Sequence, residues 1–133
     1  MEPQINADER RSELNALTEK IIGCAYHVAN VLGCGFLERV YENALTIELR
    51  KAVIEVAQQY GVQVHYEENI VGEYTADLPV ERKIVAELKT TKVLDDIHAA
   101  QCLNYLKVTG LTVCLLINFG RPKIEVKRIV NEF

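Results

Sequence analysis

The chain lacks any apolar run long enough to cross a membrane. Its longest strongly apolar stretch, residues 111–119, falls well short of the roughly 20 residues that a membrane-spanning helix needs. No basic segment followed by an apolar one opens the sequence, so we expect no secretion signal. The sequence therefore predicts no membrane association and a cytoplasmic location.

Cysteine is also scarce. Cys24, Cys34, Cys102 and Cys114 are too few and too irregularly spaced for a disulfide scaffold. No two of them are close enough in sequence to form the ligand pairs typical of a tetrahedral zinc site. We therefore expect no zinc, and we interpret the four residues as buried, reduced thiols.

Signals that would divide the chain or keep it unfolded are absent as well. There is no internal repeat and no linker rich in proline or serine. With 133 residues, 49% of them apolar and 26% charged, the composition is that of a globular domain and argues against disorder, collagen and coiled coil. We expect a single domain over residues 1–133.

Positive charge is in short supply, but it is unevenly distributed. Residues 1–81 carry 6 Lys/Arg against 14 Asp/Glu, whereas residues 82–133 carry 9 against 5, so the net charges are −8 and +4. A basic C-terminal half could contact phosphates while the acidic half faces away or collects metal. Two oppositely charged solvated faces would give the same pattern, so charge alone permits a polyanionic partner without identifying one.

Periodicity predicts the elements. Apolar residues at helical spacing indicate one helix that ends at residues 33–35 and another from residue 37 to Gly61. Alternation then predicts short strands at residues 62–66, 74–78 and 84–88, with turns at 69–72 and 81–83. Asp95 or Asp96 should begin a third helix that reaches about Lys107 and closes at Gly110. Residues 111–117 form an apolar run typical of a central strand, and a last strand includes Ile124 and Val126.

The predicted order is thus ααβββαββ, an α/β class (α+β mixed sheet) in which helices flank the sheet. Consecutive short strands joined by tight turns should be antiparallel neighbours. The strand–helix–strand unit over residues 84–117 should be a right-handed crossover that joins parallel strands.

The hairpin of the second and third strands could carry chemistry. With its turn centred near Arg82, Asp77 lies opposite Glu87, and Lys89 projects from the same face as Glu87. Directly opposed residues have Cβ atoms roughly 4.5–5.5 Å apart, so the two carboxylates repel unless a proton, Lys89 or a cation separates them. Hard oxygen ligands suit Mg²⁺ or Mn²⁺, and the lysine could hold or deprotonate a water. A solvated acid pair neutralised by a lysine is the structural alternative, and Pro79 allows a bulge there.

The third predicted helix adds polar groups. Gln101 and Tyr105 are four residues apart, on one face with Ile97 and Val108, which predicts that they point toward the sheet. A buried amide and phenol need hydrogen-bond partners, which a metal-and-phosphate site or a polar core rim would supply. We expect His98 at the surface or rim of such a site.

The second predicted helix contributes an acid in its first turn. Glu38 is favoured there by the helix dipole, and it could add a carboxylate to the metal site. Tyr41 continues the apolar stripe and is expected in the core, whereas Glu42 is expected to be solvated.

Together these motifs resemble those of the GxxExxY proteins, small members of the PD-(D/E)xK nuclease-like superfamily. The matching segments are Gly35-x-x-Glu38-x-x-Tyr41, residues 72–78, Glu87-Leu88-Lys89, Gln101-x-x-x-Tyr105 and residues 117–120. The resemblance extends from about Glu19 to Val130, and Ala76 stands where the superfamily name has proline. Some RecB-like relatives carry an Fe–S cluster on three clustered late cysteines, but here only Cys102 and Cys114 are late, so we expect no Fe–S cluster.

The resemblance implies a restriction-endonuclease-like core and a metal-dependent nuclease. Asp77, Glu87 and the Leu88 carbonyl would hold Mg²⁺ or Mn²⁺, with Glu38 helping directly or through water. Lys89 would position the attacking water, and Gln101 and Tyr105 would orient Lys89 or the scissile phosphate. The basic residues that could contact the nucleic-acid backbone are Lys92, Lys107, Arg121, Lys123, Lys127 and Arg128.

We expect DNA rather than RNA as the substrate, and a protein partner or a homodimer to span a duplex. A catalytically silent nucleic-acid-binding or protein-binding domain on the same fold is the alternative, because fold does not fix function. A third interpretation is an α/β domain without any functional site, but under it the motif matches would be coincidental. The acid–acid–lysine set favours the enzyme.

Overall fold

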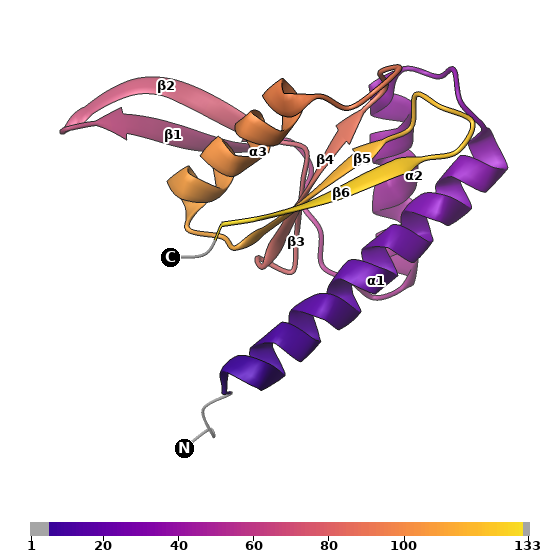
Figure 1. Ribbon diagram of the computed structural model, residues 1–133, viewed down its shortest axis with the longest axis horizontal. Coiled ribbons are helices and arrows are strands. Elements are labelled where there is room, and N and C mark those ends of the chain that lie inside the picture. Colours follow the sequence, from indigo (N-terminus) through magenta and orange to yellow (C-terminus); the bar gives the residue numbers. More distant parts are fainter. Residues whose placement is uncertain (1–5, 132–133) are drawn as a thin grey trace.

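The computed structural model describes residues 6–131, in which helices pack on both faces of a mixed sheet (Figure 1). The elements, in chain order, are α1 (Ala7–Leu32), α2 (Glu38–Lys51), β1 (Tyr60–Tyr66), β2 (Asn69–Ala76), β3 (Leu78–Val80), β4 (Ile84–Lys89), α3 (Asp96–Thr109), β5 (Val113–Asn118) and β6 (Glu125–Val130). None of the helices in this part of the chain is long and apolar enough to span a membrane. The mixed α+β class predicted from the sequence is confirmed.

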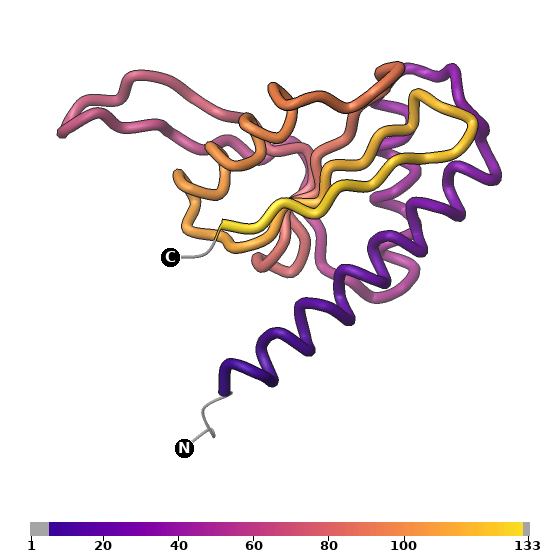
Figure 2. The backbone as a smooth tube through the Cα atoms, viewed as in Figure 1, coloured from indigo at the N-terminus to yellow at the C-terminus, as the bar shows by residue number. Residues whose placement is uncertain are grey.

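The main sheet has four strands in the order β3-β4-β5-β6. β4 and β5 are parallel and are connected through α3, whereas β3 pairs with β4 and β6 pairs with β5 in antiparallel fashion. The parallel strand–helix–strand unit predicted over residues 84–117 is therefore present. Strands β1 and β2 form a separate two-stranded hairpin that extends away from this sheet (Figure 2).

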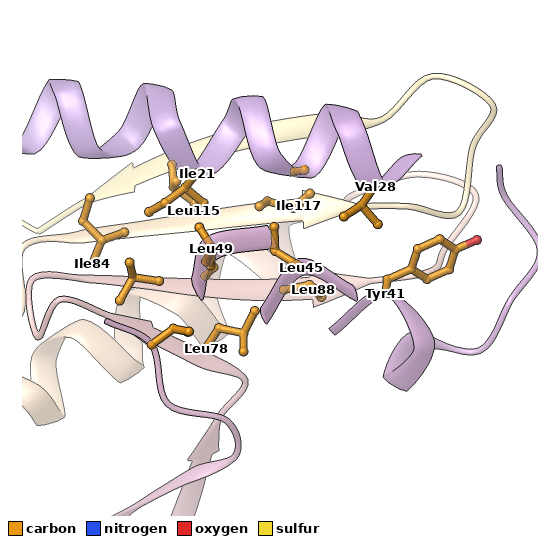
Figure 3. Close-up of a cluster of buried hydrophobic side chains, with 14 of the residues drawn as sticks. Ile21, Val28, Tyr41, Leu45, Leu49, Leu78, Ile84, Leu88, Leu115 and Ile117 are labelled. Atoms are coloured by element: carbon orange, nitrogen blue, oxygen red, sulfur yellow. The ribbon is translucent and has the colours of Figure 1, made fainter. Parts of the chain in front are cut away.

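Two apolar clusters hold the layers together. Helices α1 and α2 pack on one face of the sheet, where Ile21, Leu45 and Leu49 meet Leu88 and Ile117 (Figure 3). Helix α3 covers the other face through Cys102, Tyr105 and Leu106. All six residues of β5 are buried, as expected for a central strand covered on both sides.

Helix α2 ends ten residues before the predicted Gly61. The chain leaves the helix through Val53, which has a φ of 59° and is 90% exposed, so the predicted helical stripe stops there. The next segment lies along β3: the Ala57 N–H donates to the Pro79 carbonyl at 3.1 Å, and the Gln59 N–H donates to the Asp77 carbonyl at 2.9 Å. These bonds satisfy the free edge of β3, which local periodicity cannot anticipate.

The three predicted strands over residues 62–88 are four in the structure, so the order is ααββββαββ. The first turn lies at residues 67–68 instead of 69–72, because Glu67 adopts a φ of 58° without being a glycine. The predicted strand over residues 74–78 is broken at Asp77, where the chain passes from the hairpin into the main sheet. Pro79 causes no bulge, and the register of β3 with β4 is regular.

Candidate active site

A cavity of about 300 Å³ opens beside the break at Asp77. Its lining includes Asp77, Glu87, Lys89, Glu38, Gln101 and Tyr105, together with Glu73, Tyr74, Thr75, His98 and Cys102. Four separate parts of the chain supply these side chains: the start of α2, the second half of β2 with the following Asp77, β4, and α3. Thus the structure brings six of the residues singled out in the sequence into one cavity.

The hairpin register explains how the two acids meet. Leu78 pairs with Ala86, so Asp77 is next to Glu87 on the neighbouring strand. The Asp77 N–H donates to Oε1 of Glu87 at 3.2 Å, and the Leu88 N–H donates to Oδ2 of Asp77 at 2.9 Å. The Leu88 side chain lies on the opposite face in the α1–α2 core. Both carboxylates are therefore held by main-chain donors beside the cavity.

Burial and mutual repulsion shape the electrostatics of the cavity. Desolvation and the negative charge of Asp77 raise the pKa of Glu87 to about 9, although the Asp77 N–H and Lys89 oppose this rise. The pKa of Glu38 is also raised, by burial first and then by Asp77. Burial and Glu87 raise the pKa of Tyr105 to about 12. Without a cation, the cavity thus favours a proton on Glu87.

Within the described chain, Lys89 is the only lysine or arginine that lines this cavity. It is two residues beyond Glu87 on β4, so both side chains project from the same face. No ion pair found in residues 6–131 involves Lys89. Its ammonium group is therefore not committed to a carboxylate that would hold it away from a ligand.

The face through which helix α3 packs on the sheet only partly matches the predicted one. Gln101 is exposed, as are Ile97 and Val108, and the buried face consists of Cys102, Tyr105 and Leu106. The burial of the Tyr105 phenol is confirmed, but the prediction of a buried amide at Gln101 was wrong, because the helix packs on the sheet through Cys102, Tyr105 and Leu106. Gln101 nevertheless lines the cavity from its solvent side.

His98 is half-buried and lines the cavity. Its Nδ1 accepts the Asp95 N–H at 3.2 Å, while the Asp95 carboxylate accepts the main-chain N–H groups of Ile97 and His98. This capping box fixes the N-terminus of α3 and orients the imidazole ring.

Glu42 was predicted to be solvated, but it is only 3% exposed. Its carboxylate accepts the side-chain amides of Gln58, at 3.0 Å, and of Gln59, and it pairs with Arg39 at 3.4 Å. The Gln59 amide also donates to Oδ1 of Asp77 at 3.4 Å. A chain of polar contacts therefore runs from Glu42 through Gln59 to the candidate metal ligand.

Sequence reasoning missed Glu42 and Gln59. Glu42 stands four residues after Glu38 on α2, and only this helical spacing could have indicated that the two acids share a side. Nothing local marks Gln59, because its position depends on the pairing of residues 55–59 with β3.

The motif at Gly35, Glu38 and Tyr41 builds the support for the cavity. Gly35 has a φ of 112°, which favours glycine, and the buried Tyr41 hydroxyl donates to the Gly33 carbonyl at 2.7 Å. The Tyr41 ring stacks on Phe119 with 4.7 Å between centroids. Tyr41 thus joins the loop before Glu38 to the end of β5, and it is a core residue, as predicted.

Residues 118–120 lock the strand that carries Lys89. The fully buried Asn118 accepts the N–H groups of Thr91 and Gly120 and donates to the Thr91 carbonyl and Glu125, all at 2.9–3.0 Å. A Cβ atom at Gly120 would overlap the backbone of Thr91. The close approach therefore requires glycine, and it holds the chain just beyond Lys89.

The six basic residues predicted to contact nucleic acid do not line the cavity. Lys92 and Lys107 are exposed before and on α3, and Lys123 is exposed in the turn after β5. Lys127 shares a sheet face with Glu87, because both are in register with Leu116. Arg121 pairs with Glu125 at 3.7 Å, and Arg128 donates to Asn15 of α1 at 2.8 Å.

The cysteines are free, but only two are buried. Cys102 and Cys114 lie in the cluster under α3, whereas Cys24 is half-buried and Cys34 is exposed. The prediction of burial was therefore wrong for Cys34, which lies in the turn between α1 and α2, where no layer covers it.

The carboxylates in the cavity fit an ion such as Mg²⁺, which takes few protein ligands, better than an ion that needs three or more protein side chains. Within residues 6–131, no group of three or more His, Cys, Asp or Glu side chains is placed to hold a metal ion. Asp77 and Glu87 each engage one carboxylate oxygen with a main-chain N–H. Mg²⁺ is usually bound by one or two carboxylates with water and substrate phosphate, and these two acids match that arrangement.

Comparison with known proteins identifies the family. Residues 15–129 match the PD-(D/E)XK nuclease superfamily, and the chain belongs to it. The solved structure described as "Crystal structure of SSO0001" is similar, with a TM-score of 0.58 and 15% sequence identity over 93% of this chain. This chain matches only 63% of that protein's length, and the likeness shows a shared fold. A search of curated proteins gave no significant match.

Proposed function

We propose that this protein is a divalent-metal-dependent nuclease that hydrolyses phosphodiester bonds in DNA. The single observation that carries this proposal is the convergence of Asp77, Glu87 and Lys89 on one cavity in a member of this superfamily. Within the superfamily we assign the chain to the RecB-like branch and to the GxxExxY proteins, on the Gly35, Glu38 and Tyr41 motif and on Gln101 and Tyr105.

Asp77, Glu87 and the Leu88 carbonyl would hold Mg²⁺ or Mn²⁺, with Glu38 contributing directly or through a water. When bound, the ion supplies positive charge that offsets the carboxylates and stabilises negative charge on the phosphate oxygens. The main-chain donors at Asp77 and Leu88 keep both carboxylates in place. Because Glu87 favours its protonated form in the absence of a cation, the two acids bind a proton or a metal in competition.

Lys89 would hold the attacking water by a hydrogen bond and would offset charge that develops on the phosphate. It fits this role because it lines the cavity beside Glu87 and forms no ion pair in the described part of the chain. Gln101 and Tyr105 would orient the phosphate from the α3 side. The high pKa of Tyr105, about 12, keeps its hydroxyl protonated as a hydrogen-bond donor.

The decisive experiment compares cleavage of single- and double-stranded DNA and RNA, with Mg²⁺ or Mn²⁺, by wild type and Lys89→Ala. Wild type should cleave and Lys89→Ala should not, while a matched variant of an exposed lysine on α1, Lys20→Ala, should cleave as wild type does. Binding without cleavage by wild type under every condition would instead make this a catalytically silent binding domain.

The basic residues outside the cavity would contact the phosphate backbone of the strand away from the phosphate that is cleaved. Neutralising Lys123, Lys127 and Arg128 together should weaken binding at every sequence and reduce the slope of log K against log salt by about three units at most. Turnover at saturating substrate should persist, because none of the three lines the cavity. A protein partner or a second copy of this chain would be needed to span a duplex. We expect the cleavage to take place in the cytoplasm.

A further inference from the structure

A second cavity, of about 580 Å³, adjoins the first. Tyr105 lines both, so the two cavities are neighbours at this residue. The walls come from the segment that pairs with β3, from the outer side of β3, and from the end of α3. The volume is within the range of sites that hold small organic groups.

The walls of the second cavity suit a flat, apolar ring. Val56, Ala57, Pro79 and Leu111 supply apolar surface, and the Tyr60 side chain, which is 57% exposed, is available for stacking. Aromatic side chains that remain half-exposed beside a nucleic-acid site are typical stacking platforms for bases.

The charges of this cavity disfavour a phosphate. Glu55, Glu81 and Arg82 contribute to the lining, and Arg82 already pairs with Glu55 at 3.6 Å. Glu81 accepts the Glu55 N–H at 3.0 Å and adds a further negative charge. Carboxylates outnumber the cation, so the cavity suits an uncharged group with N–H donors, and nucleobase amino groups are such donors.

We infer that this cavity receives one nucleobase of the substrate strand, adjacent to the phosphate bound in the active site. The inference rests on the proposed nuclease function. The base stacks on Tyr60 and inserts between Pro79 and the end of α3, while Tyr105 separates it from the reacting phosphate. A base inside a duplex is stacked and paired, so only a single strand or a frayed end can place one here without unpairing it. The substrate is therefore preferentially single-stranded.

Two pairs of variants test the inference, made in the Lys89→Ala background to prevent cleavage during binding. Tyr60→Ala removes the stacking platform, and Tyr66→Ala is its control at the far end of the same strand, where the side chain is 68% exposed. Ala57→Trp fills the cavity from an exposed position, and Ala16→Trp is its control on α1. Circular dichroism and thermal melting establish that each variant is folded.

Fluorescence anisotropy with Mg²⁺ then compares a single-stranded DNA with a strand of equal length and charge in which every residue is abasic. The Lys89→Ala protein and both control variants should bind the base-containing strand about tenfold more tightly or better, given the usual strength of base stacking. Tyr60→Ala and Ala57→Trp should lose this preference, while their affinity for the abasic strand should stay the same. The inference would be overturned if the Lys89→Ala protein bound both strands equally well. It would also be overturned if the preference for the base-containing strand survived both Tyr60→Ala and Ala57→Trp.

Cleavage distinguishes this inference from the proposed function. With Lys89 intact, kcat/KM should be higher on single-stranded DNA than on a blunt duplex, and Ala57→Trp should remove that difference. Cleavage without any preference for bases would overturn the base site and leave the nuclease standing. A base preference that depends on Tyr60 in a protein that never cleaves would leave the base site standing and overturn the nuclease. A failure to bind nucleic acid at all would overturn both.

Discussion

The carboxylates of Asp77 and Glu87 are held by a reciprocal pair of main-chain bonds. The Asp77 N–H donates to Oε1 of Glu87 at 3.2 Å, while the next amide on β4, that of Leu88, donates to Oδ2 of Asp77 at 2.9 Å. The two acids therefore remain adjacent despite their repulsion, which a proton or a cation must relieve. Their adjacency is a property of the sheet and does not depend on a bound ion.

Mn²⁺ or Mg²⁺ should raise the melting temperature of the protein, because the ion binds the carboxylate pair in the folded state only and replaces the proton that Glu87 otherwise holds. An ion present at 100 times its Kd adds about 2.7 kcal/mol to the free energy of unfolding. Differential scanning fluorimetry should show this shift in wild type and lose it in Asp77→Asn/Glu87→Gln, which should itself melt higher without metal. A control with two exposed acids neutralised, Glu67→Gln/Glu68→Gln, should keep the shift. Equal stabilisation of wild type and the Asp77/Glu87 variant would place the metal elsewhere.

Stability without metal should fall as the pH rises from about 5 to 9. The pKa of Glu87 is raised in the folded state from 4.5 to about 9, so in this range the folded protein retains a proton that the unfolded chain has lost. The contribution of Glu87 is complete below the unfolded pKa and is lost by up to about 1.4 kcal/mol per pH unit toward the folded pKa. Urea unfolding of wild type and Glu87→Gln in a chelator should show a steeper decline in wild type. Parallel curves would contradict the raised pKa.

Gln59→Leu should weaken metal binding by roughly tenfold or more, the usual effect of removing a residue that orients a ligand. The Gln59 amide contacts both the buried Glu42 and Oδ1 of Asp77, so its loss frees Asp77 to rotate and leaves Glu42 with fewer donors. Isothermal titration calorimetry with Mn²⁺ measures the change. Gln63→Leu, at an exposed position on β1, is the control and should bind as wild type does. Unchanged Mn²⁺ affinity in Gln59→Leu would contradict the orienting role of the amide.

Gly120→Ala should destabilise the fold by about 1–3 kcal/mol, the typical effect of forcing an extra group into a packed site. The added Cβ would overlap the backbone of Thr91, which Asn118 holds on both sides, so neither segment can move away easily. Gly72→Ala is the matched control, because a Cβ there meets nothing within 4 Å. Chemical denaturation compares the two. Activity should fall with Gly120→Ala as well, since Thr91 follows closely after Lys89.

The sequence by itself determined the features that depend on neighbours along the chain. The spacing of two places Glu87 and Lys89 on one face of β4, and the turn centred near Arg82 sets Asp77 beside Glu87. The continuous apolar run predicts a central strand at β5, and the Asp95 cap and Gly110 bound α3. Each of these follows from backbone geometry within one element or one tight turn, so periodicity was sufficient.

The tertiary structure alone decided which surfaces meet. Residues 55–59 leave the predicted helix to pair with the edge of β3, and the resulting position of Gln59 surrounds Glu42 with donors and buries it. The same pairing forms one wall of the second cavity, and the way α3 packs on the sheet leaves Gln101 exposed. Partners far apart in sequence compete for each free edge and apolar face, and the outcome depends on the total burial and hydrogen bonding of the whole chain. No local period encodes that competition.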